Sequence, residues 1–317
     1  MERRFLGSAG LPVSVLSLGT AALGMAYGIH AGEDRSAGEP PPAETEALAL
    51  LQKAVDAGIN FIDTARAYGN SETLIGRALH TRRDAVFIAT KVHCLDQSGT
   101  PLTGQALRTQ VQESLHRSLK ALRTDHVDLL MVHSAPPALL ERDEIHRVLE
   151  TARSQGYSRL IGASTYGVVA PRLAIEGGLD AVQLAYNVLD RRAEAEILPL
   201  ARSRGTGVVV RSVYLKGALT ERGENLPDHL EDLRQLSRCF RDIAASYHLE
   251  PAEVALRFAL SHDAITTILV GVRSEAELQT ALAAAAKGRL PPEILADLET
   301  LRTENPLLID PSRWGIP

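Results

Sequence analysis

The chain has 317 residues, of which 45% are hydrophobic and 23% charged, and its formal net charge is −5 at pH 7. This length fits one large domain, because a single α/β barrel uses ~250 residues. The chain lacks the lysine- and arginine-rich runs that bind nucleic acid or membrane surfaces. It also lacks the ~20 consecutive apolar residues of a membrane helix. The two cysteines form no CxxC pair and the histidines show no metal-binding spacing, so the composition disfavours a disulfide framework and a metal site.

The amino-terminal segment predicts a small hairpin followed by the first buried strand. Residues 4–6 and 11–13 are short apolar runs, and residues 7–10 between them include two glycines. Two arginines followed by an apolar stretch resemble a signal peptide, but Pro12 and Gly19 interrupt that stretch. We therefore interpret the segment as part of the fold and expect a cytoplasmic protein without nucleic-acid or membrane partners.

Short apolar runs and longer amphipathic stretches alternate along the rest of the chain. We predict eight strands, at residues 13–18, 60–63, 86–91, 127–132, 160–163, 181–184, 207–211 and 266–270. Helical patterns occupy residues 44–57, 71–79, 103–122, 143–154, 193–204, 230–247, 251–260, 275–286 and 292–303. Apolar strands that lack strict polar alternation and are separated by helices are typical of a parallel sheet buried on both faces.

Repeated strand–helix units predict parallel strands joined by right-handed crossovers. Eight strands without an obvious linker favour an α/β fold of the (β/α)8 TIM-barrel type over an open sheet. We expect an N-terminal β-hairpin and extra C-terminal helices, all in one domain over residues 1–317. Residues 25–42 follow the first strand and form either a pocket wall or a surface loop.

Polar or glycine residues end nearly every predicted strand. They are Gly19, Thr20, Asp63, Lys91, His133, Ser164, Thr165, Gln183, Arg211, Ser212, Gly271 and Arg273. In a barrel, the carboxyl ends of the strands meet on one face, and this face carries the chemistry of such enzymes. Ionisable side chains at successive strand ends therefore predict an active site there.

Asp63, Tyr68, Lys91 and His133 together suit proton transfer to a carbonyl oxygen. A phenol has a reference pKa of ~10, and a nearby ammonium favours the phenolate and lowers that pKa. A carboxylate beside the lysine holds it charged, and a neutral imidazole can hydrogen-bond a substrate oxygen. Such a set protonates a developing alkoxide, but a cofactor must supply the hydride.

Several segments resemble the signature of the aldo-keto reductase family. Residues 61–72 read FIDTARAYGNSE, and further matches lie at residues 90–91, 128–133, 183–187 and 270–274, in order and at family-like spacing. The resemblance runs from about residue 4 to residue 301. It looks closest to bacterial members of the family that have a long first loop.

This resemblance implies a role for each matching residue. Tyr68 would be the general acid in carbonyl reduction and the base in alcohol oxidation, tuned by Lys91 and Asp63, while His133 positions the carbonyl. The residues that would surround a nicotinamide cofactor are Gly19, Thr20, Asp63, Ser164, Thr165, Gln183, Asn187, Arg211, Ser212, Leu215, Gly217, Gly271, Arg273, Glu277 and Thr280. The expected contacts to a small carbonyl or alcohol substrate are Tyr27, His93, His133 and Trp314.

Three positions depart from the family pattern. Arg211 stands where the family usually has an aromatic that stacks on the nicotinamide, so its charge should disfavour the oxidised cofactor relative to the reduced one. Thr165 stands where asparagine is most common. Glu277 would repel a 2′-phosphate, whereas Arg273 would attract one. We expect NADP, with NAD as the alternative.

Two other functions remain open at this stage. The auxiliary β subunits of potassium channels resemble aldo-keto reductases, so the chain could be a cofactor-binding sensor with little turnover. Alternatively, Lys91 could form a Schiff base in a lyase or aldolase. The sequence identifies neither the substrate nor the oligomeric state.

Overall fold

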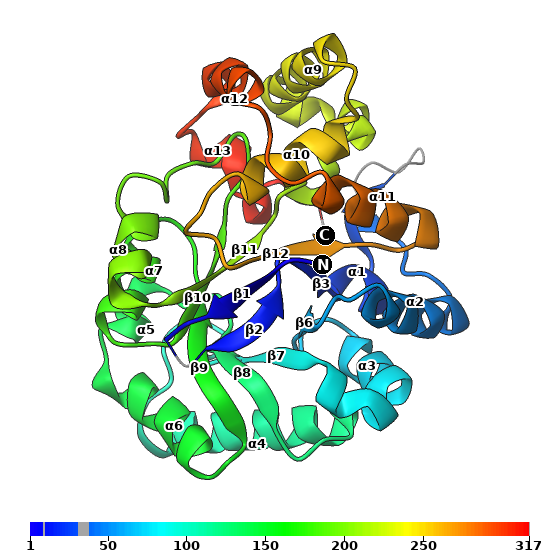
Figure 1. The fold of residues 1–317 in the computed structure, drawn as a ribbon. Coiled ribbons are helices and arrows are strands. Elements are labelled where there is room, and N and C mark those ends of the chain that lie inside the picture. The colour runs from blue at the N-terminus through cyan, green and yellow to red at the C-terminus, as the bar shows by residue number, and fades with distance from the viewer. Residues whose placement is uncertain (9, 31–37, 317) are drawn as a thin grey trace.

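The amino-terminal hairpin closes one end of the molecule. The computed structural model describes residues 1–8, 10–30 and 38–316. Strands β1 (Arg3–Leu6) and β2 (Leu11–Ser14) pair antiparallel in front of the barrel in Figure 1. Gly7 and Gly10, which flank the turn, have φ values of 67° and 74°, a conformation that glycine adopts without a Cβ clash. The predicted hairpin is confirmed.

Eight parallel strands close into a barrel (Figure 1). In the order in which they pair, they are β3 (Leu16–Gly19), β6 (Phe61–Asp63), β7 (Phe87–Val92), β8 (Val127–Val132), β9 (Ser158–Ser164), β10 (Ala181–Ala185), β11 (Gly207–Arg211) and β12 (Thr267–Gly271). The predicted (β/α)8 fold is confirmed. The first predicted strand, 13–18, is divided between β2 and β3 by a bend at Val15, where the Ser14 hydroxyl donates to the Leu16 carbonyl (2.7 Å).

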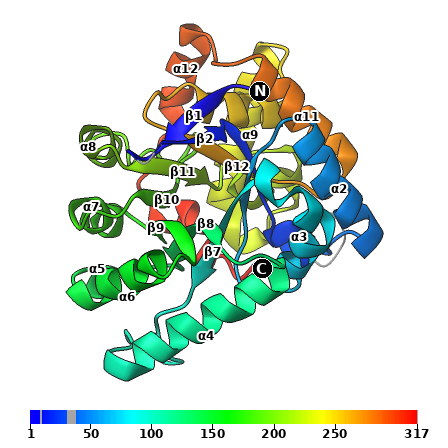
Figure 2. The ribbon, with the colours of Figure 1, turned by 60° about the horizontal axis from the view of Figure 1, so that its bottom comes forward.

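Helices surround the barrel, as the two views in Figures 1 and 2 show. The longer ones are α2 (Glu44–Asp56), α3 (Ser71–Leu79), α4 (Gly104–Leu122), α6 (Asp143–Ser154), α7 (Val169–Glu176), α8 (Ile197–Arg204), α9 (Glu231–Ser246), α10 (Pro251–Leu260), α11 (Glu275–Ala286) and α12 (Pro292–Leu298). Shorter elements are α1 (Ala21–Gly24), α5 (Pro137–Leu140), α13 (Pro306–Ile309), the strand pair β4 (Tyr27–Ile29) and β5 (Gly38–Glu39), and 3-10 turns at His80–Ala85, Leu215–Gly217, Glu221–Asn225, Asp228–Leu230, Glu299–Leu301 and Pro311–Arg313. The extra C-terminal helices were predicted.

Several boundaries differ from the sequence-based expectation. Helix α7 is missing from the prediction; its Pro171 lies in the first turn, where a missing N–H costs little. Helix α8 begins at Ile197 and not at residue 193, because the Asn187 side chain holds the preceding residues in a turn by accepting from Leu189 N and Asp190 N (both 3.0 Å). Part of the predicted loop 25–42 pairs as β4 and β5, and residues 31–37 of it lie outside the described residues.

Alternation along each strand separates the barrel interior from its helix-facing layer. A cluster of apolar side chains fills the interior: Leu6, Val13, Phe61, Ala89, Leu129, Met131, Leu160, Ala181, Val209 and Leu269. Leu6 and Val13 come from the hairpin, so the hairpin plugs the amino end of the barrel. A larger cluster packs between the strands and the helices. The open, functional end is therefore the carboxyl end of the strands.

None of the helices in the described part of the chain is both long and apolar enough to cross a membrane.

Candidate active site

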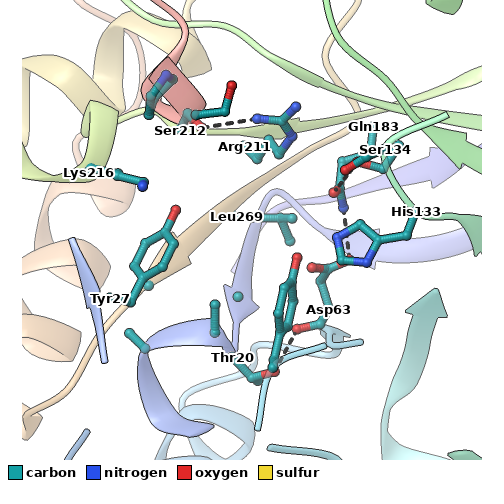
Figure 3. Close-up of a pocket in the computed structure, with 18 of the residues that line it drawn as sticks. Thr20, Tyr27, Asp63, His133, Ser134, Gln183, Arg211, Ser212, Lys216 and Leu269 are labelled. Carbon is teal, nitrogen blue, oxygen red and sulfur yellow. Dashed lines mark hydrogen bonds between the residues drawn. The ribbon is translucent and has the colours of Figure 1, made fainter. Parts of the chain in front are cut away.

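The strand period of two brings one polar set to the carboxyl end of the barrel. Every second side chain of a strand points to the same face, so residues two or four positions beyond the interior apolar residues also face the barrel axis. At the carboxyl ends of the strands these residues are Gly19, Asp63, Lys91, His133, Ser164, Gln183, Arg211 and Gly271. All of them except the deeper Lys91 line a cavity of about 270 Å³, together with the predicted residues Thr20, Tyr27, Tyr68 and Ser212. Figure 3 shows Lys216 and Tyr27 on one side of this cavity and His133 and Gln183 on the other.

Lys91 lies beneath the cavity floor as a fully buried cation. Its ammonium donates to both carboxylate oxygens of Asp63 (2.8 and 2.6 Å), to the Thr64 carbonyl (3.0 Å) and to the Tyr68 hydroxyl (3.2 Å). Burial alone would lower the pKa of Lys91, but the Asp63 charge and hydrogen bonds raise it above its usual value. Lys91 is therefore charged at neutral pH and points that charge at the Tyr68 oxygen.

Tyr68 projects from the loop between β6 and α3. Burial raises the pKa of its phenol, and the Lys91 ammonium opposes this only in part, so the pKa lies above the ordinary value of 10.0. Lys91 thus acts with the expected sign, but desolvation is the larger effect. Tyr68 is consequently protonated at neutral pH, as a proton donor must be.

His133 follows β8 and faces the same cavity. Its ring centroid lies 5.7 Å from that of Tyr68 and 4.5 Å from that of His93. Burial, followed by the charges of Lys91, His93 and Arg211, lowers the pKa of His133 to about 2, so the imidazole is neutral. Within the described residues its buried Nδ1 has no hydrogen-bond partner. A buried ring nitrogen of this kind is suited to a ligand oxygen.

Gln183 and Ser164 form a polar network with the Asp63 carboxylate. The Gln183 amide donates to Asp63 (2.8 Å) and accepts from the Ser164 hydroxyl (3.1 Å). Thr165, in contrast, does not line the cavity. As the next residue after an inward-facing one it points away, and its buried hydroxyl donates to the Gln183 carbonyl (3.1 Å). Its expected cofactor contact is not supported by this position.

Comparison with known proteins identifies the family. The model of the Aldo/keto reductase family matches residues 15–303. This chain belongs to the aldo/keto reductase family. Its barrel is similar to that of aldo-keto reductase AKR11C1 from Bacillus halodurans in its holo form, with a TM-score of 0.79, 26% sequence identity and coverage of 99% of each chain.

Curated relatives of the aldo/keto reductase include an enzyme and a channel subunit. Pyridoxal 4-dehydrogenase from Microbacterium luteolum is 29% identical over 324 residues, covering 88% of this chain and 91% of the relative. A putative voltage-gated potassium channel subunit beta from Schizosaccharomyces pombe is also 29% identical, covering 96% and 94%. The family and its enzymes support an oxidoreductase function. Because the enzyme and the channel subunit are equally similar to this chain, sequence identity does not distinguish between these two functions, and the geometry of the site carries that argument.

Arg211 of this aldo/keto reductase has an unusual setting in the cavity wall. Its guanidinium lies 4.3 Å from the Tyr166 ring centroid and donates to the Thr165 carbonyl (2.9 Å) and the Ser212 hydroxyl (3.4 Å). In the described part of the chain no carboxylate forms an ion pair with it. The stack leaves Arg211 as a fixed, uncompensated cation beside the active-site space.

The loop after β11 carries a second such cation, Lys216. Its ammonium donates to the Ile316 carbonyl (2.6 Å), and burial lowers its pKa to about 8 although Asp310 opposes this shift. Leu215 and Gly217, the predicted cofactor residues on either side, do not line the cavity; Leu215 is buried in the core. Sequence reasoning named these two and missed the side chain between them.

The predicted adenosine-end residues gather around Glu277. Its carboxylate accepts from the Arg222 guanidinium (2.8 Å) and from the backbone N–H of Arg273 (2.7 Å), and Arg273 in turn donates to the Tyr27 carbonyl. Thr280 lies one turn further along α11, and its hydroxyl donates to the Ala276 carbonyl (2.9 Å). Arg222, which the sequence did not point to, is needed to compensate the Glu277 charge.

The predicted substrate residues divide into two groups. Tyr27 and His133 line the cavity, and His93 is exposed beside His133 at its edge. Trp314 does not face the cavity. It is 1% exposed, and its indole N–H donates to the Leu307 carbonyl within the carboxyl-terminal tail (2.9 Å), while its own carbonyl lies 3.0 Å from Nε2 of His229. The expected substrate contact of Trp314 is not supported by this position.

Several cavity residues carried no signal in the sequence. They are Ala21, Ala22, Ser134, Tyr166, Lys216, Leu269, Pro311 and Ser312. Of these, Ser134 and Tyr166 immediately follow the predicted site residues His133 and Thr165 and could have been included on that basis. Pro311 and Ser312 belong to the carboxyl-terminal tail, which Lys216 and His229 contact at the Ile316 and Trp314 carbonyls. Among the described residues, no cluster of three or more histidine, cysteine, aspartate or glutamate side chains could hold a metal ion.

Proposed function

We propose that this aldo/keto reductase is an NAD(P)H-dependent carbonyl reductase in which Tyr68 is the general acid. The observation that carries the proposal is the hydrogen bond between the Lys91 ammonium and the Tyr68 hydroxyl (3.2 Å), with Lys91 held by Asp63. A buried ammonium stabilises the phenolate left after proton transfer, which lowers the barrier to donation.

Each residue of this chain has one task in the reduction. The neutral ring of His133 hydrogen-bonds the carbonyl oxygen and aims it at Tyr68, and the Tyr68 hydroxyl gives that oxygen a proton. Lys91 then faces a phenolate, and Asp63 keeps Lys91 charged throughout. The cofactor, when bound, supplies the hydride that the carbonyl carbon accepts. In alcohol oxidation the proton returns to Tyr68.

The cavity suits a nicotinamide dinucleotide in its donor chemistry. In the described part of the chain Lys216 forms no ion pair, although the Asp310 charge acts on it, and the pyrophosphate of such a cofactor is an anion that this ammonium would attract. Ser164 and Gln183 offer hydroxyl and amide groups to a carboxamide. Gly19 and Gly271 keep side chains out of the space at β3 and β12.

We further propose NADPH as the preferred form. The Arg222 guanidinium pairs with Glu277, and the half-buried Arg273 guanidinium lies within electrostatic reach of Glu277 and Glu39. These two guanidinium groups are the cations that a 2′-phosphate would bind. The variants Arg222→Gln and Arg273→Gln should weaken NADPH binding and leave NADH binding nearly unchanged, as measured by titration calorimetry. Equally weakened binding of NADPH and NADH would show that Arg222 and Arg273 do not bind the 2′-phosphate.

The reductase proposal is tested by NADPH consumption with a panel of aldehydes and ketones. Tyr68→Phe and Lys91→Met should lower kcat by roughly 10²–10⁴-fold, as expected on losing general acid catalysis. Full activity in Tyr68→Phe would exclude Tyr68 as the acid. The substrate within this class, such as the aldehyde of a pyridoxal-like compound or a simpler carbonyl, is what the panel identifies.

A cofactor sensor is the second candidate, and the channel-subunit relative is the observation that favours it. Tight NADPH binding without oxidation by any carbonyl in the panel would support it. The Schiff-base lyase is disfavoured, since a nucleophilic lysine must lose its proton, whereas two carboxylate hydrogen bonds keep Lys91 protonated.

A further inference from the structure

The loop that carries Tyr68 depends on side chains for its position. Residues 64–70 lie between β6 and α3 and contain no helix or strand. The Thr64 and Ser71 hydroxyls share a hydrogen bond (2.7 Å) that joins the two ends of the loop. Since Tyr68 must stay within hydrogen-bond distance of Lys91 on β7, a further contact between this loop and β7 would set the distance between the two groups.

Glu72 makes that contact. It lies in the first turn of α3, and its side chain is 2% exposed. One carboxylate oxygen accepts from the Arg66 guanidinium (2.9 Å), and the other accepts from the Thr90 hydroxyl (2.7 Å). Arg66 lies two residues before Tyr68, and Thr90 immediately precedes Lys91. The carboxylate therefore connects the two chain segments that present the phenol and the ammonium.

The two oxygens of the Glu72 carboxylate accept from both groups at once. Arg66 and Thr90 approach different oxygens, and a glutamine would turn an N–H₂ group toward one of them. Burying a carboxylate is costly unless it is paired and hydrogen-bonded, so the Arg66 contact and the N–H groups of the first turn of α3 stabilise it here. The Glu72 carboxylate is therefore stable in its buried position only while residues 64–70 and β7 keep the arrangement that supplies these contacts.

We propose that Glu72 is a positioning residue for the Tyr68–Lys91 pair, an inference that rests on the proposed function of these two residues. Through Arg66 it holds the loop of Tyr68, and through Thr90 it holds the strand of Lys91. When either contact is lost, the loop moves relative to β7, the Tyr68–Lys91 hydrogen bond lengthens and the phenolate loses part of its stabilisation.

The sharpest test changes Thr90, because it leaves every charge in place. Thr90→Val keeps the shape and removes the donor to Glu72, whereas Thr90→Ser keeps the hydroxyl. Glu72→Gln tests the carboxylate directly. Glu113→Gln is the control, because Glu113 is an exposed partner of Arg117 on α4 and, among the described residues, forms no hydrogen bond or ion pair with Arg66, Glu72 or Thr90.

We expect Thr90→Val and Glu72→Gln to lower kcat about tenfold or more while KM for NADPH changes by at most about twofold, since misplacement affects the chemical step more than binding. The pKa of Tyr68 should rise in both variants. This rise moves the basic limb of the kcat profile to higher pH, and it also appears in the ultraviolet titration of Tyr68, read as the difference from the matching Tyr68→Phe protein. Thr90→Ser and Glu113→Gln should behave like the wild type.

A purely structural role for Glu72 predicts another result. Thr90→Val would then lower the melting temperature while kcat and the Tyr68 titration stay as in the wild type, and this would overturn the proposal. If Glu72→Gln fails to fold, the Thr90 pair decides. If the wild type shows no turnover, the reductase proposal fails, and the ultraviolet titration of the Thr90 variants still decides whether Glu72 positions Tyr68.

Discussion

At the residue scale, burial decides which protonation states the site offers. His133 has a pKa lowered to about 2, below the ordinary 6.5. The unfolded chain therefore takes up this proton first as the pH falls below ~6.5, and folding stability declines as the pH decreases toward the folded-state value. His133 is thus a neutral hydrogen-bonding group in the folded enzyme at every physiological pH.

This linkage gives a measurable stability effect. Between pH 7 and pH 5, the wild type should lose about 2 kcal/mol of unfolding free energy through His133 alone. His133→Gln removes the titrating group, so its loss over the same range should be smaller by that amount, measured by urea unfolding at both pH values. An identical pH dependence in both proteins would mean that His133 titrates normally.

Arg211 predicts a preference for the reduced cofactor. A fixed cation stacked on Tyr166 disfavours a second positive charge, and the oxidised nicotinamide ring is positive. In Arg211→Gln the ratio of the Kd for NADP+ to the Kd for NADPH should fall several-fold, measured by calorimetry. Arg172→Gln, an exposed arginine on α7, is the control. An unchanged ratio in Arg211→Gln would show that Arg211 does not lie near the nicotinamide ring of the bound cofactor.

The residue scale also shows where sequence reasoning succeeds and fails. The Asp63, Tyr68, Lys91 and His133 set follows from the strand period and the family signature, because both depend on short-range order in the chain. The expected contacts of Thr165 and Trp314, which their positions do not support, could not be judged from the sequence for a different reason. Whether a residue next to a strand end points inward, and where a tail docks, depends on tertiary packing that one sequence does not encode locally.

At the element scale, the close contact between α1 and the Tyr68 loop fixes the active-site floor. A Cβ at Gly24 would lie 2.1 Å from the Tyr68 carbonyl oxygen, and a Cβ at Gly69 would lie equally close to that of Gly24. The two glycines therefore let α1 pack directly against the loop. The sequence predicted α3 from its apolar periodicity and the barrel strands from their continuous apolar runs, whereas four-residue α1 has too few positions to show either pattern.

Gly24→Ala should consequently reduce both stability and activity. Forcing a methyl group against fixed backbone costs about 1–3 kcal/mol, and the displaced loop should lower kcat. Gly156→Ala is the matched control, because Gly156 has a φ of 80° and open space around it, so only stability should fall. Unchanged kcat in Gly24→Ala, measured beside the unfolding free energy, would show that the loop does not depend on α1.

At the scale of the whole molecule, one end of the barrel provides stability and the other provides chemistry. Leu6 of the hairpin is fully buried against the interior cluster, while its neighbour Phe5 is 71% exposed. Leu6→Ala should lower the unfolding free energy by roughly 2–5 kcal/mol, as for other large buried side chains, and Phe5→Ala should lower it by less than about 0.5 kcal/mol. Neither should change kcat at a temperature where both variants are folded. A lower kcat in folded Leu6→Ala would contradict this division.

The central claim is that a hydride reaches a carbonyl carbon while Tyr68 protonates its oxygen. The most direct measurement uses NADPH deuterated at the transferred position, a reactive aldehyde, and mass spectrometry of the alcohol formed by the wild type and by Tyr68→Phe. We predict deuterium on the carbinol carbon of the wild-type product and almost no alcohol from Tyr68→Phe. An alcohol without deuterium, or equal yields from the two proteins, would contradict the account.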